Sequence, residues 1–226
     1  VCIGAEPHSE EQRKRIEQLL GVKAYNCFGM SEMNGPGVAF ECTEQNGLHI
    51  WEDNVIVEIV DPVTLQPVPE GEVGELVLTT INREAMPLLR YRTRDLTCIL
   101  PGDCPCGRTH KRLARFKGRS DDMIILKGVN LFPIQIEKIL MQFKELGSNY
   151  LITLETIGNS DEMLIEVELS DLFTDDYSAL QRLTKGITRQ LKDELLLTPR
   201  IKLVAKGSLP TTDGKAVRVK DHRKLC

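Results

Sequence analysis

The chain changes character at a run of five consecutive non-apolar residues, Gly118-Arg119-Ser120-Asp121-Asp122. Before this run, short apolar stretches such as LHIWE, VIVEIVD and ELVLTTI alternate with turns rich in Gly and Pro, which is typical of a β-rich fold. After it, the hydrophobic pattern predicts strand 123–127, helix 133–143, strands 149–157 and 162–169, helix 175–195 and strand 200–205. The sequence therefore predicts two domains, 1–120 and 121–226.

The two parts have different expected folds. In the second part, two helices packed on one small, largely antiparallel sheet make an α+β domain. The first part opens with an amphipathic surface helix over 9–20, which begins at Ser9, carries acids in its first turn, has Ile16, Leu19 and Leu20 on one face and stops at Gly21. A short strand over 22–25 follows it, and the β-rich stretch after residue 47 reads as a distorted barrel or a sheet margin.

Composition excludes several classes of protein. With 226 residues, 41% hydrophobic and 27% charged, the chain is an ordinary globular protein rather than a disordered one. Its net charge of −4 argues against a nucleic-acid partner. No apolar run approaches the roughly 20 residues that span a bilayer, so we expect no membrane partner and a cytoplasmic location. The chain begins at Val1, inside what reads as a strand, which indicates a fragment.

Seven cysteines, at positions 2, 27, 42, 98, 104, 106 and 226, show no disulfide framework, and reduced thiols are expected. Cys104-Pro105-Cys106-Gly107 forms a short knuckle, and a structural Zn²⁺ needs four nitrogen or sulfur ligands. Cys42 and His49 flank a turn that supplies the other two, with His110 as the alternative histidine. Free thiols and an ordinary buried histidine are the competing interpretation, and the remaining four cysteines read as core, binding-site or surface residues.

Four separated segments each have the residues of a nucleotide site. Residues 25–32 (YNCFGMSE) offer an aromatic ring for a base, a glycine, a hydroxyl and a carboxylate. Residues 91–95 (YRTRD) end in a carboxylate that could accept hydrogen bonds from a ribose. A glycine turn follows the strand after the polar junction at 118–122, and the turn LPTTDG at 209–214 leads into Lys215 and a basic tail. Taken singly, they also read as a structural turn, a charged strand end, a linker and a solvated terminus.

Taken together and in this order, the four segments resemble the core motifs of the adenylate-forming superfamily, which includes acyl-CoA synthetases, luciferases and peptide-synthetase adenylation domains. More closely, the chain is similar to the C-terminal half of phenylacetate-CoA ligases, through the segments GAEPHSEEQRKRIEQLLGVKAYNCFGMSEMNGPGVAFEC, GLHIWED, EAMPLLRYRTRD, CPCGRTH and KGRSDDMIILKGVNLFPIQIE. The resemblance covers essentially the whole chain. The phosphate loop rich in Thr, Ser and Gly, which lies in the family's N-terminal region, has no counterpart here.

The resemblance implies a fold and an activity. The fold class is α/β and α+β: the C-terminal, β-rich portion of a large adenylate-forming domain, followed by a mobile α+β lid. The activity is ligation of an aryl acid such as phenylacetate to coenzyme A through an acyl-adenylate, with ATP and Mg²⁺ and with release of AMP and pyrophosphate. The implied partners are the small aryl acid, CoA, the rest of the ligase and a second copy in a homodimer. The alternatives are a ligase for another acid or acceptor, and a zinc-stabilised nucleotide-binding module without independent catalysis.

The resemblance also assigns roles to residues. Lys215 stabilises the charge at the α-phosphate, Glu32 helps to position Mg²⁺, and Asp121 is the hinge of the lid. The Mg²⁺ assignment agrees with that ion's preference for carboxylate, phosphate and water oxygens. Asp95 holds the ribose, Arg119 contacts ribose or phosphate, and Lys127 and Gly128 lie beside the thiol of CoA. The adenine and α-phosphate are contacted by Gly4, Ala5, Glu6, Asn26, Cys27, Phe28, Gly29 and Ser31.

Overall fold

A computed structural model describes residues 1–6, 8–33, 35–171, 177–211 and 216–223. The chain forms two compact units, one of residues 1–7 and 16–122 and one of residues 8–15 and 123–226. The boundary after Asp122 falls two residues beyond the one expected from the sequence, and the second unit also takes in residues 8–15, which the sequence did not indicate.

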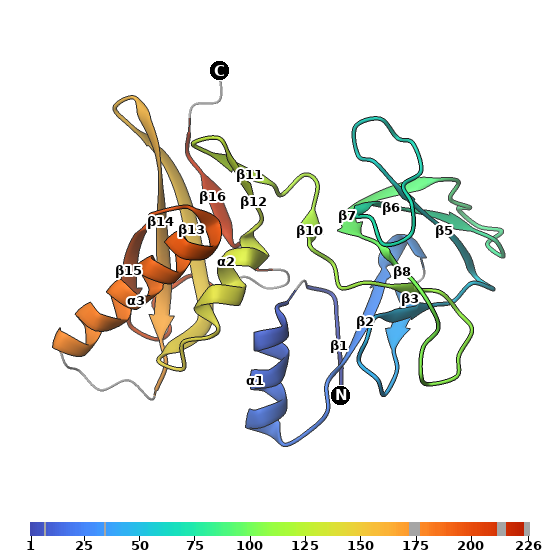
Figure 1. Cartoon of the computed structure of the whole chain (residues 1–226), viewed down its shortest axis with the longest axis horizontal. Coiled ribbons are helices and arrows are strands. Elements are labelled where there is room, and N and C mark those ends of the chain that lie inside the picture. The colour runs from blue at the N-terminus through green and yellow to red at the C-terminus, as the bar shows by residue number, and fades with distance from the viewer. Residues whose placement is uncertain (7, 34, 172–176, 212–215, 224–226) are drawn as a thin grey trace. The chain divides into compact units, whose positions relative to one another are not determined.

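The first unit contains two β-sheets (Figure 1). The six-stranded sheet has the order β1-β2-β3-β4-β9-β8, made of β1 (Cys2–Ile3), β2 (Tyr25–Met30), β3 (Gly35–Glu41), β4 (Leu48–Ile50), β9 (Arg112–Leu113) and β8 (Ile99–Leu100). The four-stranded sheet has the order β10-β7-β6-β5, made of β10 (Gly118–Arg119), β7 (Tyr91–Thr97), β6 (Gly74–Thr80) and β5 (Val55–Val60).

Both sheets contribute to one hydrophobic core. Val38 and Ile50 come from the six-stranded sheet, whereas Ile59, Leu76 and Leu78 come from the four-stranded sheet. Strand β6 is buried at almost every position, and its sequence GELVLTT has three consecutive apolar residues and a single charged one. The β-rich stretch therefore forms two sheets that share one core.

Helix α1 (Glu10–Leu20) begins where the sequence predicted, because the Ser9 hydroxyl accepts a hydrogen bond from the Gln12 amide at 3.2 Å. Its burial differs from the simple amphipathic reading. Arg13 is buried, whereas Leu19 and Leu20 are exposed. The one-turn 3₁₀ helix η1 (Ser31–Met33) follows β2 directly and buries Met33.

The second unit has a four-stranded sheet in the order β15-β14-β13-β16. Its strands are β15 (Arg200–Val204), β14 (Ser160–Leu169), β13 (Leu146–Ile157) and β16 (Val219–Asp221). The expectation of a largely antiparallel sheet is wrong: β13 and β14 form an antiparallel hairpin, but β15 pairs parallel with β14 and β16 parallel with β13. Each outer strand reaches the hairpin through a long connection, and such connections permit parallel pairing.

Two helices and a small hairpin complete the second unit. Helix α2 (Pro133–Leu140) has proline at its first position, and α3 (Tyr177–Leu195) buries Leu183, Ile187 and Leu191 at spacings of four. In Figure 1, α3 crosses in front of the sheet, and the two helices share one core with it. Strands β11 (Ile124–Leu126) and β12 (Val129–Leu131) form a separate two-stranded sheet.

Within the described ranges, no helix has both the length and the apolar character needed to cross a membrane.

Candidate functional site

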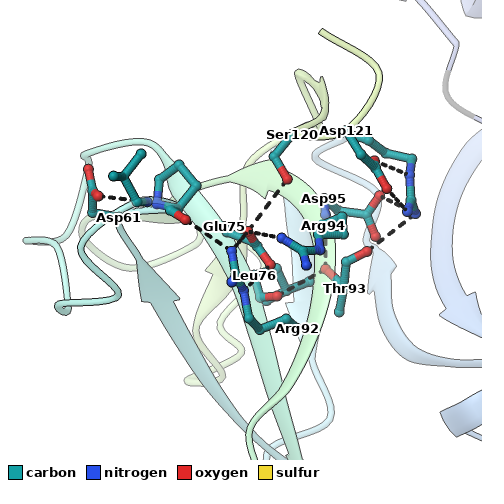
Figure 2. Close-up of polar contacts among 12 residues, drawn as sticks. Asp61, Glu75, Leu76, Arg92, Thr93, Arg94, Asp95, Ser120 and Asp121 are labelled. Carbon is teal, nitrogen blue, oxygen red and sulfur yellow. Dashed lines mark hydrogen bonds and ion pairs between the residues drawn. The ribbon is translucent and has the colours of Figure 1, made fainter.

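Three residues singled out in the sequence meet beside strands β7 and β10. Arg119 lies opposite Asp95 in the antiparallel register, and its Nη1 atom is 3.9 Å from the Asp95 carboxylate. The same guanidinium donates two hydrogen bonds of 2.9 Å to the carboxylate of Asp121 (Figure 2). This bidentate pair lowers the pKa of Asp121 and raises that of Arg119. The expected ribose, phosphate and hinge residues are therefore adjacent.

An irregularity in β7 determines how Asp95 is presented. The pairing of β6 with β7 shifts between Glu75 and Val77, and at this point Arg94 has a φ angle of +70°. Left-handed backbone is costly for a residue with a side chain, and bulges of this kind occur next to active sites. The Thr93 hydroxyl accepts a hydrogen bond from the Asp95 amide at 3.1 Å, and the Arg94 carbonyl accepts one from the Ser120 amide at 2.7 Å.

A fully buried carboxylate, that of Glu75 on β6, contacts two arginines of this irregular strand. Arg92 donates to it through Nε at 2.8 Å and Nη2 at 2.6 Å, and Arg94 lies 3.9 Å away (Figure 2). The Ser120 hydroxyl lies 3.5 Å from the same carboxylate. Burial alone would raise the pKa of Glu75, but the hydrogen bonds and charge of Arg92, with the charge of Arg94, outweigh burial and lower it.

The expected adenine wall is built where β1 lies parallel to β2. A Cβ atom on Gly4 would stand 2.5 Å from the carbonyl oxygen of Cys27, so this close approach requires glycine. Ala5, next in the chain, has a φ angle of +69° and is exposed. The ring of Phe28 packs against Phe116, with 4.4 Å between ring centroids.

The other residues expected around the nucleotide lie on or near β2 and η1. Asn26 is buried, and its side-chain amide donates to Glu41 at 3.0 Å. Gly29 belongs to β2, Ser31 and Glu32 belong to η1, and the Glu32 carbonyl accepts a hydrogen bond from Arg83. Glu6 lies in the bend after β1. Contacts of these residues with adenine, phosphate or Mg²⁺ stay predictions.

The residues expected beside CoA lie in the second unit. Lys127 and Gly128 are the two residues that join β11 to β12, and their φ angles are +49° and +80°. Two left-handed residues in a two-residue loop make a type I′ turn. Lys215 lies outside the described residues.

Four side chains in the first unit form a compact cluster of metal-ligand type. The ligand atoms of Cys42, His49, Cys104 and Cys106 all lie within 4.8 Å of one another. The sulfur atoms of Cys42 and Cys104 are 3.7 Å apart, and Cys106 Sγ is 3.4 Å from His49 Nε2. A tetrahedron with Zn–S bonds of about 2.3 Å has sulfur atoms about 3.8 Å apart, so the donors fit this ion.

The protonation states of two of the four ligands also suit a cation, whereas burial raises the pKa of the Cys42 thiol. A hydrogen bond from the Arg108 backbone, opposed by burial and supported by the Arg108 side chain, lowers the pKa of Cys106 to about 7. Burial lowers the pKa of His49, which favours the neutral imidazole that binds metals. His110, the alternative ligand, is not part of the four-residue cluster and instead lies edge-on to Trp51.

A buried arginine joins the two halves of this cluster. Arg112 donates to the carbonyl of Asn46, in the turn between Cys42 and His49, at 2.9 Å. It also donates to the carbonyls of Gly102 at 3.0 Å and Asp103 at 3.3 Å, just before the knuckle. The hydrogen bonds of Arg112 to these carbonyls therefore help to hold the four ligands together.

Sequence reasoning missed Glu75, Arg92 and Arg112. The signal for Glu75 was present, since it is the one charged residue of a strand whose next three residues are apolar. A charge in that context predicts a buried partner. Arg112 had no comparable signal, because its acceptors are backbone carbonyls distant in the sequence.

Comparisons with known proteins identify the family of the chain. The pattern of the AMP-binding enzyme family matches residues 1–82, and that of the AMP-binding enzyme C-terminal domain matches residues 128–223. The chain belongs to this family of AMP-binding enzymes. Its similar relatives include phenylacetate-coenzyme A ligases from Thermus thermophilus (43% identical over 99% of this chain), Pseudomonas putida (44% over 98%) and Escherichia coli (41% over 99%). The chain spans 54%, 50% and 51% of those relatives, about half of each.

A solved structure is similar over nearly the whole chain. Crystal structures of 2-hydroxyisobutyryl-CoA ligase with an acyl-AMP bound superpose with a TM-score of 0.88, at 30% and 31% identity, over 97% of this chain and 48% of that chain. A benzoate CoA ligase from Burkholderia xenovorans has a TM-score of 0.63 at 22% identity, over 93% of this chain and 42% of that chain, which is a likeness of fold alone.

Proposed function

We propose that this chain is the C-terminal half of an AMP-forming ligase that joins an aryl acid, phenylacetate in the first instance, to coenzyme A. The observation that carries the proposal is the contiguity of Asp95, Arg119 and Asp121 at the junction of β7 and β10. The similarity of 40–44% to phenylacetate-coenzyme A ligases over the whole chain supports it. The N-terminal half of the ligase, with its phosphate loop, is the expected partner.

In this proposal the residues of the first unit bind and orient the nucleotide. The Asp95 carboxylate, whose side chain is largely buried, accepts hydrogen bonds from the ribose hydroxyls. Arg119 is held by Asp121 and so presents its positive charge in a fixed direction, toward ribose or phosphate. Gly4, Ala5, Glu6, Asn26, Cys27, Phe28 and Gly29 enclose the adenine, and Ser31 faces the α-phosphate.

Glu32 is the residue proposed to help hold Mg²⁺. Its carboxylate is a hard oxygen donor, which suits this ion together with phosphate and water oxygens. When bound, the ion neutralises phosphate charge. The second unit is proposed to be the mobile lid, with Asp121 as its hinge and with Lys127 and Gly128 beside the thiol of CoA.

Lys215 is proposed to stabilise the charge that develops on the α-phosphate as the carboxylate attacks. Removing one such fixed donor typically costs about 3–4 kcal/mol of transition-state stabilisation. Lys215→Ala in the complete ligase is therefore expected to abolish adenylate formation and largely to spare thioester formation from pre-made acyl-adenylate. Equal loss of both half-reactions would contradict the role of Lys215.

The experiment that tests the proposed function measures acid-dependent exchange of pyrophosphate into ATP, and then thioester formation after CoA is added. The complete ligase is compared with this chain alone, using phenylacetate, benzoate, 2-hydroxyisobutyrate and a fatty acid. Activity with phenylacetate above the others supports the proposal. Preference for another acid would favour the alternative ligase, and nucleotide binding without exchange by the complete protein would favour the binding module.

We also propose a structural Zn²⁺ held by Cys42, His49, Cys104 and Cys106. The fit of the sulfur separation to a tetrahedral ion supports it, as does the burial of three of the four residues. The site contains four protein ligands, so it leaves no open position for a substrate. Zinc would therefore stabilise the first unit and take no part in the reaction.

Two further expectations belong to the whole protein. The cytoplasmic location is proposed from the sequence, in which the cysteines show no disulfide framework. The expectation of a homodimer rests on the family resemblance, and light scattering of the complete ligase tests it.

A further inference from the structure

The turn that carries Lys127 and Gly128 belongs to a hairpin of only two short strands, β11 and β12. The hairpin pairs Ile124 with Leu131 and Leu126 with Val129, and Lys127 and Gly128 form the turn. The two strands form a sheet of their own rather than extending the four-stranded sheet. Because an isolated two-stranded hairpin is marginally stable in water, its position depends on what it contacts.

One face of this hairpin is held by apolar packing. Ile124, Leu126 and Leu131 are buried in the core of the second unit, whereas Ile125, between the first two, is half exposed. Apolar contacts are non-directional, so they hold the hairpin against the core without fixing its slide or tilt. A directional contact is supplied at Ile125, whose carbonyl oxygen accepts a hydrogen bond of 2.6 Å from Nη1 of Arg223.

Arg223 is itself fixed by two carboxylates. It donates to Asp221 through Nε at 2.9 Å and Nη2 at 2.7 Å, in the bidentate geometry that only arginine provides. Its Nη1 atom also lies 3.2 Å from the carboxylate of Asp161. The Arg223 side chain is only 10% exposed, although it lies near the end of the chain.

The two carboxylates belong to the four-stranded sheet. Asp221 ends β16, where it pairs with Leu154 of β13, and Asp161 lies at the start of β14. We call Arg223, Asp221 and Asp161 the Arg223 latch. Through the latch, the rigid sheet holds the backbone of β11 two residues before the turn that carries Lys127 and Gly128.

We propose that Arg223 is a positioning residue for thioester formation, because its latch fixes the β11–β12 hairpin at the place where Lys127 and Gly128 meet CoA. The inference rests on the proposed function. It adds Arg223, which would affect thioester formation only through the position of the β11–β12 hairpin. Adenylate formation is proposed to use Lys215 and the nucleotide-binding residues of the first unit, and none of these residues belongs to the latch or to the β11–β12 hairpin. The two half-reactions should therefore respond differently to changes at Arg223.

The test uses the complete ligase with Arg223→Met, which keeps the length of the side chain and removes its charge and hydrogen bonds. Pyrophosphate exchange is expected to stay within about threefold of wild type. Single-turnover thioester formation from pre-made acyl-adenylate is expected to fall at least about tenfold, with a higher CoA concentration needed for half-maximal rate. Arg223→Lys keeps the charge but loses the bidentate guanidinium geometry. Its rate of thioester formation should lie between those of wild type and Arg223→Met.

The matched control is Lys202→Met, which removes an ion pair with Glu166 on the same sheet and away from the hairpin. It should leave both half-reactions unchanged. Amide hydrogen exchange of residues 124–131 should increase in Arg223→Met and not in Lys202→Met.

The rates of the two half-reactions decide whether Arg223 positions the hairpin. Equal loss of both half-reactions in Arg223→Met would mean that Arg223 only stabilises the fold, and unchanged thioester formation would mean that the latch is dispensable; either result overturns the inference. Wild-type ligase that shows no acid-dependent exchange would instead overturn the proposed function.

Discussion

Single residues in the first unit show how a buried charge maintains an irregular strand. Glu75 has no exposed surface, and its partners Arg92 and Arg94 flank the distorted part of β7 that leads to Asp95. Arg92 itself keeps part of its side chain in water. The desolvation free energy is smaller when only the carboxylate is fully buried than when both charges are. This explains how the Glu75–Arg92 pair can exist next to the hydrophobic core.

Glu75→Gln is expected to destabilise the chain by about 1–3 kcal/mol, because it removes the charge from a buried, hydrogen-bonded pair. The pKa of Glu75 lies below its ordinary value of 4.5, so the pair contributes stability above that pH and loses it as pH falls. Urea unfolding from pH 3 to 7 should therefore give a flatter acid limb for the variant than for wild type.

The control for this prediction is Glu58→Gln on the neighbouring strand β5. Glu58 pairs at 3.1 Å with Arg90, whose side chain is mostly exposed, and such pairs contribute about 0–1 kcal/mol. Equal effects of the two substitutions, or an unchanged acid limb in Glu75→Gln, would show that the buried pair has no special role.

The backbone at Arg94 gives a second test. With a φ angle of +70°, this position penalises any side chain, so Arg94→Gly should be more stable than Arg94→Ala by about 1 kcal/mol. Both variants lose the guanidinium, so their difference in unfolding free energy reports the backbone alone. The control is Lys202 in β15, which does not have a positive φ angle. There, the alanine variant should be more stable than the glycine variant. If the glycine variant were the more stable one at both positions, or the alanine variant at both, the argument would be contradicted.

At this scale, sequence reasoning anticipated which side chains of metal-ligand type lie together, and it missed the contacts that depend on a distant acceptor. The grouping of Cys42 and His49 with the 104–106 knuckle followed from ligand types, and the structure brings these four side chains together. The contact of Arg223 with the Ile125 carbonyl could not be anticipated, because backbone acceptors have no signature in the sequence.

Elements were predicted well wherever local periodicity was strong. Strands β5, β6, β13 and β14 and helices α1 and α3 lie close to their expected bounds. Strand β16 was missed, since its three residues lie in a basic tail and form a strand only by pairing with β13. The direction of β15 and β16 was likewise not encoded locally.

The β11–β12 turn is an element whose sequence conflicts with its conformation. A type I′ turn favours asparagine or glycine at its first position, where this chain has Lys127. Lys127→Asn should therefore raise the free energy of unfolding by about 0.5–1 kcal/mol, whereas Lys127→Ala, which keeps the backbone penalty, should not. Chemical denaturation of the chain measures both. A Lys127→Asn variant less stable than wild type would show that the lysine side chain stabilises the fold.

The same variants separate stability from function. Lys127 is proposed to lie beside the thiol of CoA, so Lys127→Asn in the complete ligase should bind CoA more weakly although the hairpin is better formed. A strained residue kept at a functional position is expected when its side chain is needed there.

At the scale of the whole molecule, the chain is a pair of units with separate cores, and the proposed zinc belongs to one of them. The purified chain, prepared without chelator, should contain about one Zn²⁺, and less than about 0.2 per chain would reject the site. Cys104→Ser should lose the metal. Cys98→Ser, which changes a buried cysteine outside the cluster, should retain it.

Removing zinc should also act on one unit only. The four ligands come from two turns that are otherwise joined by Arg112, so loss of the ion should loosen residues 42–49 and 102–106 and lower the stability of the first unit. The core of the second unit contains none of these ligands, and its buried amides on β13 and β14 should exchange at the wild-type rate. Hydrogen exchange with and without chelator measures both. Uniform loosening of the two units would mean that the ion, if present, stabilises the chain in some way other than through this cluster.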